Sequence, residues 1–579
     1  MDVTPYLALR TAPQVLFDHL DERRSRPRFM LPTPDGDWRA VTWGNFARQV
    51  REVGSFLAAG DIRPGDRGAV FAPNRVEWAS AALAIQAAGG VMVPIYPAST
   101  AEQAAYVASH SDARVVFVDT PALLARIFEY WAGYEEVQRI ITLDDGLDVA
   151  RVLADLRAKG RSAPSDAWAQ RRVMTWSEAR AAGAARDKER PGEFERVLRE
   201  VDYDAPAMML YTSGTSGNPK GVPLSHRNVG SNTQDWLRNN ASILPEKGVD
   251  VLWLPMSHIF GFGEMGLGNL LGFTTYMSDP ATVLARLPEV HPDVFMSVPA
   301  YWEKLAMQAQ AAGDLDAQRA KLREITGGRL QFCLSGGAGL KREIKEFFHQ
   351  HGVLIIEGYG LTETSPTLTL NRPDRFRFDT VGVPLPSVEL QLAEDGEILA
   401  KGPNVFRGYH KDEAATREAF THDGWFKTGD VGRWTDDGFL QIIDRKKDIL
   451  VTAGGKNVPP ANIEVRFADD PLVAHVVVYG DGKRYLVAGV WLNDAEVSAR
   501  FGAAHSAERD AAVKAAVQHS IDRVNAQLAS YETIKRFAVI DEALTVNAGL
   551  LTASLKVRRK KVYEHFRARF EALYEEARA

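Results

Sequence analysis

Hydroxyl and glycine residues gather in one stretch that ends on a lysine: Thr212, Ser213, Gly214, Thr215, Ser216, Gly217, Asn218, Pro219 and Lys220. Glycines let a backbone approach a polyphosphate closely, and hydroxyl groups can donate hydrogen bonds to phosphate oxygens. The lysine would offset negative charge that repels an anionic nucleophile. We therefore interpret residues 212–220 as a phosphate-binding loop.

The spacing in this loop differs from that of mononucleotide kinases and GTPases. Their pattern is GxxxxGK[ST], and Gly214 and Lys220 fit it. Pro219, however, stands where the second glycine belongs, and Gly221 replaces the Ser or Thr that would bind magnesium. A kinase or GTPase loop is therefore disfavoured.

The loop is expected at the carboxyl end of a strand. The apolar residues 207–211 before it predict a buried strand, and Ser225 after it is placed to cap a helix. Earlier in the chain, strands and helices are predicted to alternate, with strands at 68–71, 91–96 and 114–118 and helices at 76–88 and 101–109. This alternation indicates βαβ units and a parallel sheet covered on both faces.

Two further strands are predicted to end in glycine-rich turns. They lie at 330–334 and 353–356, and the turns that follow them lie at 335–339 and 357–364. Ligands of open parallel sheets bind outside the carboxyl ends of the strands. We therefore expect both turns and the phosphate-binding loop to face one crevice.

The last part of the chain differs from these lobes. Hairpin-like strands are predicted from Val381 onwards, and the charged stretch 444–448 indicates a hinge between domains. The sequence thus predicts an α/β protein, with two βαβ-type lobes and a β-rich subdomain in residues 1–443 and a small α+β domain in residues 449–579. Residues 1–40 show little periodicity and are interpreted as an entry arm.

Composition limits the partners and the compartment. With 69 Lys and Arg against 75 Asp and Glu, the net charge of −6 is too balanced for a protein that binds nucleic acid by neutralising phosphates. Cys333 is the one cysteine, which excludes internal disulfides and fits a reducing cytoplasm. The longest apolar run, 81–96, is interrupted by Gln, Gly and Pro and fails as a membrane span. Peripheral contact with the inner membrane face and the oligomeric state stay open.

Several stretches resemble, in this order, the motifs of the adenylate-forming superfamily of acyl-CoA synthetases, luciferases and peptide-synthetase adenylation domains. They are residues 211–221, 358–363, 427–430, 444–448 and 452–459. The resemblance is close to the long-chain fatty acyl-CoA synthetase branch and runs from about residue 15 to residue 570. One such stretch could be accidental, but the whole set in this order is highly specific.

The resemblance implies a two-step reaction and a small domain that moves between the steps. A carboxylate, here that of a fatty acid, attacks the α-phosphate of ATP to give acyl-AMP and pyrophosphate. The thiol of coenzyme A then takes the acyl group. Magnesium is the implied cofactor, with ATP and coenzyme A as co-substrates. Such chemistry needs positive charge placed where charge develops and no protein nucleophile, so Cys333 is most simply a core residue.

The resemblance also assigns roles in the nucleotide site. The phosphate-binding loop would hold the pyrophosphate part of ATP. Thr362 would contact the α-phosphate, and Glu363 together with Thr212 would hold magnesium, a hard cation suited to oxygen ligands. Tyr359 would stack on adenine in a pocket lined by Gly337, Ala338, Gly358 and Gly360.

Three charged residues later in the chain complete the nucleotide site and the hinge. Asp430 would accept hydrogen bonds from the ribose hydroxyls, and Arg445 would reach the ribose or the phosphates. Lys447 occupies the polar hinge position about which the family rotates its small domain. Without the resemblance, Lys447 would be interpreted as an ordinary solvated linker residue.

Lys556 is the candidate for the lysine that bridges the carboxylate and the α-phosphate during adenylation. The family places this lysine in a Gly-Lys context, whereas Leu555 precedes it here, as it tends to do in long-chain members. Lys560 and Lys561 are competing assignments. The run 556–561 is alternatively a solvated patch or one that faces an anionic membrane.

The acid-binding site is expected in residues 252–263, where a strand runs into an aromatic and glycine-rich turn. His258 in this turn matches a family histidine at the carboxylate end of the acyl pocket. Phe262 falls where long-chain members carry an aromatic gate over a fatty-acid tunnel, and we hypothesise that it moves when ATP binds. A histidine among aromatic residues is also often a packed core residue.

Three other functions stay open at this stage. One is an acyl-AMP ligase that loads a carrier protein, and another is a CoA ligase for an aromatic or branched acid. The third is a nucleotide-binding regulator that has lost turnover. Acyl-AMP ligases typically carry an insertion ahead of the hinge, which is not seen in the sequence. The filled catalytic positions argue against a regulator.

Overall fold

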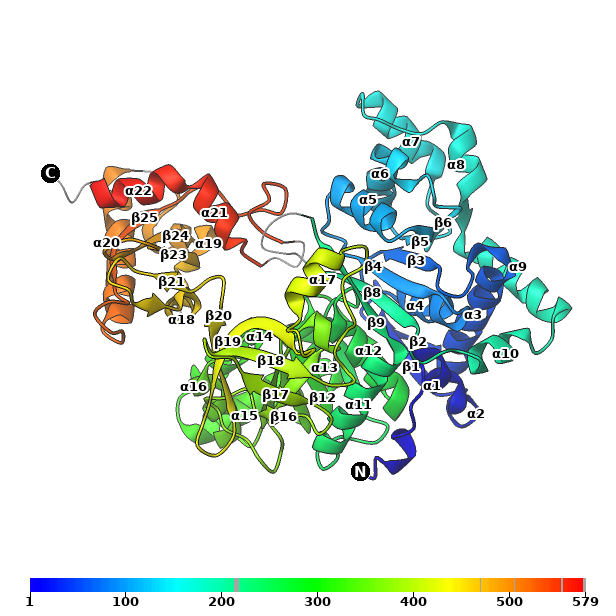
Figure 1. The fold of residues 1–579 in the computed structure, drawn as a ribbon, viewed down its shortest axis with the longest axis horizontal. Coiled ribbons are helices and arrows are strands. Elements are labelled where there is room, and N and C mark those ends of the chain that lie inside the picture. The colour runs from blue at the N-terminus through cyan, green and yellow to red at the C-terminus, as the bar shows by residue number, and fades with distance from the viewer. Residues whose placement is uncertain (213–217, 469, 505, 553–555, 576–579) are drawn as a thin grey trace. The chain divides into compact units, whose positions relative to one another are not determined.

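The computed structural model describes residues 1–212, 218–468, 470–504, 506–552 and 556–575 (Figure 1). The chain divides into two compact units. The large unit contains Met1–Leu390, Ala400–Phe426 and Trp434–Leu440, and the small unit contains Gln391–Leu399, Lys427–Arg433 and Gln441–Ala579. The domain limits expected on either side of residues 444–448 stay a prediction.

The first sheet of the large unit confirms the predicted βαβ lobe. Its strand order is β7-β6-β5-β3-β4-β8-β9, and neighbouring strands are parallel except for β8 and β9. The strands are β3 (Arg67–Phe71), β4 (Val91–Ile95), β5 (Ala113–Val118), β6 (Arg139–Thr142), β7 (Val173–Thr175), β8 (Pro206–Thr212) and β9 (Lys220–Ser225). Helices α4 (Val76–Ala87) and α5 (Ala101–His110) connect successive parallel strands, close to the predicted bounds. The central strands are apolar and buried along their length, as expected for a sheet covered on both faces.

The second sheet of the large unit has the strand order β16-β15-β14-β13-β12-β10-β11-β1-β2. Its strands are β1 (Pro27–Pro32), β2 (Trp38–Thr42), β10 (Val249–Leu252), β11 (Thr274–Met277), β12 (Val294–Ser297), β13 (Phe332–Ser335), β14 (Ile355–Gly360), β15 (Thr367–Leu370) and β16 (Val383–Pro384). The central pairs are parallel, and the pairs at both edges are antiparallel. The predicted strand before the first glycine-rich turn is confirmed as β13. The second overlaps β14, but β14 runs to Gly360, so residues 357–360 of the predicted second turn belong to the strand.

Residues 1–40 are more than the predicted entry arm. Strands β1 and β2 complete one edge of the second sheet, and helix α1 (Ala12–Asp18) precedes them. Arg28 in β1 is fully buried, and its guanidinium donates to the Asn269 side chain at 2.7 Å and to the Met265 carbonyl at 3.0 Å. A buried arginine interrupts the apolar pattern from which a strand is recognised, so the pattern alone did not predict β1.

Residues 252–263 are predicted as a strand that runs into a glycine-rich turn, but strand β10 ends at Leu252 and the second half of the stretch is helical. Helix α12 (Ile259–Leu271) begins there, with His258 as its N-cap. Glycine disfavours a helix by about 1 kcal/mol relative to alanine. Here burial of nearly the whole helix outweighs that cost, because Phe262, Met265 and Leu267 enter the core of the large unit.

The small unit confirms the predicted α+β unit. Strands β23 (Val473–Tyr479) and β24 (Leu486–Leu492) form an antiparallel hairpin around the predicted turn at Asp481 and Gly482. Strand β25 (Ile534–Val539) pairs in parallel with β24, and helix α20 (Ala507–Asn525) packs its apolar side chains on this sheet. The small unit also contains most of β20 (Leu440–Arg445), which ends at the charged stretch 444–448. Among the residues that the structure describes, no helix combines the length and apolarity needed to cross a bilayer.

Candidate active site

The two ends of the predicted phosphate-binding loop lie on paired strands. Thr212 at the end of β8 and Lys220 at the start of β9 are register partners in an antiparallel pair, so they face each other at the carboxyl end of β8. Ser225 ends β9 and caps helix α11 (His226–Asn240), as predicted, by accepting from the Asn228 N–H at 3.0 Å. Of the predicted loop residues, Ser213, Gly214, Thr215, Ser216 and Gly217 lie outside the described residues.

The two glycine-rich turns meet at one edge of the second sheet because β13 and β14 are parallel neighbours. The first turn carries Gly337, whose φ of 82° lies in the left-handed region that glycine tolerates, and the exposed Ala338. The second carries Gly358, Tyr359 and Gly360 at the end of β14. A Cβ atom on Gly360 would lie 1.7 Å from the Pro366 carbonyl oxygen, so only glycine fits there.

A buried ion pair, which no sequence pattern predicted, holds these turns together. Glu357 on β14 pairs with Lys345 on helix α16 (Arg342–Gln350), and both side chains are about 4% exposed. The Glu357 Oε1 also accepts from the Leu340 N–H at 2.8 Å, at the end of the first turn. Burial raises the pKa of the Glu357 carboxyl, and the charge on Lys345 opposes this. A glutamate directly after the buried residues Ile355 and Ile356 was the available sequence signal, because a charge there needs a partner.

Thr362 and Glu363 lie in the last part of the second turn, in the short 3-10 helix Thr362–Thr364. Glu363 is 8% exposed, and the Tyr409 hydroxyl donates to its Oε1 at 3.0 Å. Magnesium is commonly bound through one or two protein carboxylates, with water and substrate phosphates as its remaining ligands. A single buried carboxylate such as Glu363, with the Thr212 hydroxyl as a second oxygen donor, fits this requirement.

His258 and Phe262 both belong to the start of helix α12. The His258 Nδ1 accepts from the Phe260 N–H at 3.2 Å, which leaves the proton of a neutral ring on Nε2. Phe262 is 4% exposed and packs edge-on against Trp78, with ring centroids 6.1 Å apart. The helix N-cap therefore orients the histidine, and the phenylalanine is a core contact of the next helical turn. Their roles at an acid-binding site stay predictions.

Three predicted residues come together within the small unit. The Arg445 Nε lies 2.8 Å from the Asp430 Oδ1, with Arg445 at the end of β20 and Asp430 on β19 (Phe426–Trp434). Lys556 has an exposed side chain, yet surrounding protein atoms lower the pKa of its ammonium, Arg445 adds to this and Asp430 opposes it. We call Asp430, Arg445 and Lys556 the charged cluster. Lys447, the predicted hinge residue, is exposed in the turn that follows β20.

A second ion pair anchors the segment that carries Lys556. Arg559 forms a two-pronged contact with Glu464, in which its Nη2 lies 2.6 Å from the Glu464 Oε2. The Glu464 Oε1 also accepts from the Val478 N–H on β23 at 2.7 Å, so the pair is fixed to the central sheet of the small unit. Of the competing candidates, Lys561 pairs with Glu564 at 2.7 Å, and Lys560 is exposed, as Lys556 is. Sequence patterns did not predict this anchor, since its partners are far apart in the chain.

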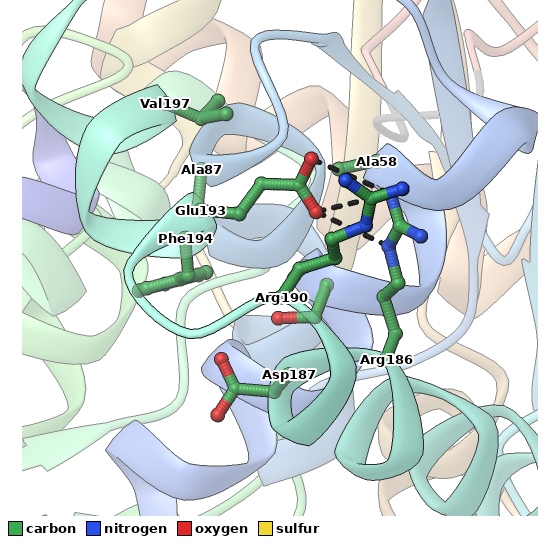
Figure 2. A pocket seen from close by; sticks show the side chains of 10 residues that line it. Ala58, Ala87, Arg186, Asp187, Arg190, Glu193, Phe194 and Val197 are labelled. Atoms are coloured by element: carbon green, nitrogen blue, oxygen red, sulfur yellow. Dashed lines mark hydrogen bonds and ion pairs between the residues drawn. The ribbon is translucent and has the colours of Figure 1, made fainter.

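A pocket elsewhere in the large unit is filled by its own charged side chains. The Arg186 Nε donates to Glu193 at 3.1 Å, and Arg190, Asp187 and Phe194 also line the pocket (Figure 2). None of the predicted site residues is among those that line it. We assign no function to this pocket.

The structure thus groups the described site residues by unit. The large unit contains the loop ends, both glycine turns, Thr362, Glu363, His258 and Phe262, whereas the small unit contains the charged cluster and Lys447. The functional roles of all these residues stay predictions.

Residues 17–410 match the AMP-binding enzyme family, and residues 447–578 match the AMP-binding enzyme C-terminal domain. The long-chain-fatty-acid–CoA ligase FadD15 of Mycobacterium bovis is 33% identical, over 93% of this chain and 93% of the relative. Long-chain-fatty-acid–CoA ligase 6 of Mus musculus is 28% identical, over 98% of this chain and 87% of the relative.

Solved structures with lower identity share the fold. The A domain of a carboxylic acid reductase from Segniliparus rugosus, in complex with AMP and a co-purified carboxylic acid, has a TM-score of 0.80 and 23% identity, over 98% of this chain and 94% of that one. The O-succinylbenzoate coenzyme A synthetase of Bacillus subtilis, in complex with ATP and magnesium ion, has a TM-score of 0.67 and 21% identity, over 94% of this chain and 98% of that one. Both likenesses support the predicted α/β architecture with a smaller C-terminal part.

Proposed function

Because the chain belongs to the AMP-binding enzyme family, as an adenylate-forming acyl-CoA ligase, we propose that it activates a long-chain fatty acid with ATP and transfers it to coenzyme A. The products are acyl-CoA, AMP and pyrophosphate. The observation that carries this proposal is the similarity, over nearly the whole chain, to long-chain-fatty-acid–CoA ligases from a bacterium and a mammal.

In the first step, a carboxylate oxygen attacks the α-phosphorus of ATP while the bond to the pyrophosphate oxygen breaks. Both reactants are anions, so catalysis depends on cations placed around the developing charge. Lys220 is proposed to hold the pyrophosphate, which leaves, and Lys556 to bridge the attacking carboxylate and the α-phosphate. Thr362 would donate a hydrogen bond to an α-phosphate oxygen.

Magnesium, when bound, would neutralise part of the phosphate charge. Glu363 and Thr212 are the residues proposed to hold it. The Tyr409 hydroxyl limits the orientations of the Glu363 carboxylate by donating to one of its oxygens. Tyr359 and the glycine turns would receive the adenine ring.

In the second step, the thiolate of coenzyme A attacks the acyl carbon of acyl-AMP and AMP leaves. The attacking sulfur belongs to the substrate, which agrees with the burial of Cys333 at 1% exposure. Burial raises the pKa of the Cys333 thiol and so disfavours the reactive thiolate. We propose that rotation at Lys447 withdraws Lys556, which follows the hinge, between the two steps, whereas Asp430 and Arg445 precede the hinge and stay with the nucleotide.

Helix α12 is the proposed wall of the acid site. His258 at its N-cap would lie near the carboxylate, and Phe262 would act as the gate of a hydrocarbon tunnel. Phe262→Leu is expected to change the chain-length preference and its dependence on ATP. If both stay as in the wild type, the gate assignment is wrong.

The purified chain, assayed with ATP, magnesium and a panel of acids, tests the function. Pyrophosphate release is followed with and without coenzyme A, and the panel contains saturated, branched and aromatic acids. We expect release with long saturated acids and acyl-CoA as the product. Acyl-AMP that accumulates and is not consumed by coenzyme A would favour a carrier-loading ligase, and turnover of aromatic or branched acids alone would favour a different acid class. No release across the panel would favour a regulator without turnover.

A further inference from the structure

Residues 406–410, which we call the bridge segment, connect two parts of the proposed ATP site within the large unit. At its start, the Phe406 N–H donates to the Glu363 carbonyl at 2.8 Å. At its end, the His410 N–H donates at 2.9 Å to the carbonyl of Gly221, the residue after Lys220 on β9. The bridge segment is therefore tied by its backbone to both the proposed metal ligand and the proposed phosphate lysine.

The side chain of Tyr409 repeats this connection. Its hydroxyl donates to the Glu363 Oε1 at 3.0 Å, and the Lys220 Nζ lies over its ring, 4.8 Å from the centroid. The ring is itself held in place, because the Tyr409 N–H donates to the Thr416 Oγ1 at 2.9 Å and the Phe406 ring packs against it at 4.9 Å. One fixed aromatic side chain thus contacts two opposite charges.

The chemistry of these contacts leaves both charges in place. A phenol that donates to a carboxylate orients it without adding a positive charge, and an aromatic face attracts an ammonium through its quadrupole without neutralising it. A direct ion pair between Glu363 and Lys220 would instead cancel the charges that magnesium and pyrophosphate need. We propose that Tyr409 is a positioning residue that orients Glu363 and Lys220 for magnesium–ATP while keeping them from pairing with each other.

This inference rests on the proposed function, because it takes Glu363 as a metal ligand and Lys220 as a phosphate contact. Two substitutions separate the effect of Tyr409 on Glu363 from its effect on Lys220. Tyr409→Phe removes the hydroxyl and keeps the ring, so it acts on Glu363 alone. Tyr409→Leu removes both and acts on Lys220 as well.

Binding calorimetry on the full chain, without any acid, measures both effects. ATP is titrated at a series of magnesium concentrations, and AMP, which lacks the pyrophosphate, is titrated in parallel. We expect Tyr409→Phe to raise the half-saturating magnesium concentration about tenfold, since a hydrogen bond to a charged group is lost. Tyr409→Leu should bind ATP about threefold more weakly than Tyr409→Phe does, because the contact between the ring and Lys220 is lost as well. AMP binding should stay within twofold of the wild type in both variants.

Tyr203→Phe is the matched control. It also removes a hydroxyl from the large unit, where Tyr203 donates to the Gln14 Oε1 at 3.1 Å, and it should not change the magnesium dependence. The inference is overturned if Tyr409→Phe leaves the magnesium dependence within twofold of wild type, if Tyr203→Phe shifts it equally, or if AMP binding falls together with ATP binding. Failure of the wild type to bind ATP would instead overturn the proposed function.

Discussion

The glycine turns of the large unit and the charged cluster of the small unit are held by different kinds of ion pair. In the large unit, Glu357 and Lys345 form a pair with both side chains buried, and Glu357 also accepts from a backbone N–H. In the small unit, the Asp430 side chain is 6% exposed, but its partner Arg445 is 57% exposed. A fully buried pair resists separation because each charge would be left without water, whereas the exposed Arg445 regains water when its pair opens.

This difference indicates how one chain can serve two steps. The proposed adenine pocket has to keep its shape while ATP becomes acyl-AMP and then AMP, and buried contacts provide that. Lys556 is proposed to act in the first step and to leave Asp430 and Arg445 before the second. An exposed charge suits a group that leaves between the steps, because little free energy is lost when water replaces its contacts.

Removal of Lys556 should have the largest effect of all the changes, and this effect should be confined to adenylation. Lys556→Ala is expected to slow adenylation by about 100-fold or more, because a cation near the developing charge is lost. Thioester formation from supplied acyl-AMP should stay near the wild-type rate. Rapid-quench measurement of each half-reaction checks this. Lys560→Ala, which removes a neighbouring exposed cation, is the control and should affect neither step. Loss of the second step instead would contradict the assignment.

Breaking the buried pair should instead reduce the stability of the large unit. Lys345→Met leaves Glu357 buried without its partner and is expected to lower the free energy of unfolding by about 3 kcal/mol. Burial already raises the pKa of Glu357, so its uncharged form becomes favoured as the pH falls. The loss of unfolding free energy in Lys345→Met should therefore shrink at low pH and grow as the pH rises.

Urea unfolding at several pH values measures this deficit. Lys321→Met is the control, because Lys321 forms an exposed pair with Glu324 at 2.7 Å and should cost less than about 1 kcal/mol. Equal losses in the two variants would remove the distinction between buried and exposed pairs.

The anchor of Lys556 allows a sharper test within the small unit. Glu464→Gln weakens the contact with Arg559 and should release the segment that carries Lys556. We expect adenylation to fall about tenfold, through loss of positioning, and thioester formation from acyl-AMP to fall far less. A parallel fall in both half-reactions would mean that Glu464 only stabilises the small unit.

The smallest expected effects are shifts in pH dependence within the charged cluster. Desolvation by surrounding protein atoms is the main cause that lowers the pKa of Lys556, Arg445 lowers it further and Asp430 raises it. Adenylation needs the protonated lysine, so it should decline as the pH rises through that lowered pKa. Asp430→Asn should move this decline to lower pH and Arg445→Gln to higher pH. A pH profile of adenylation under ATP saturation measures the shifts. Shifts in the same direction would contradict the claim that Asp430 and Arg445 act oppositely on the pKa of Lys556.

Local patterns predicted those parts of the fold and the site that depend on neighbours in the sequence. Strand β8, the Ser225 cap, β13 with the turn after it and the start of β14 follow from apolar runs and from glycine and capping residues. Parallel pairing then explains why the two turns meet at one edge.

The remaining features depend on contacts between distant residues. Helix α12 forms despite its glycines because it is buried, and Arg28 enters β1 because Asn269 and Met265 receive its hydrogen bonds. Tyr409 and Glu363 are far apart in the chain, and so are Glu464 and Arg559. Such partners carry no periodic signal, so only the folded chain brings them together.

Exchange of labelled pyrophosphate into ATP, measured without coenzyme A, tests most directly whether this chain forms an acyl adenylate. The wild type should catalyse exchange that depends on magnesium and on a long saturated acid, and Lys556→Ala should abolish it. Absence of exchange with saturated, branched and aromatic acids alike, in a preparation that binds ATP, would contradict the proposed activity.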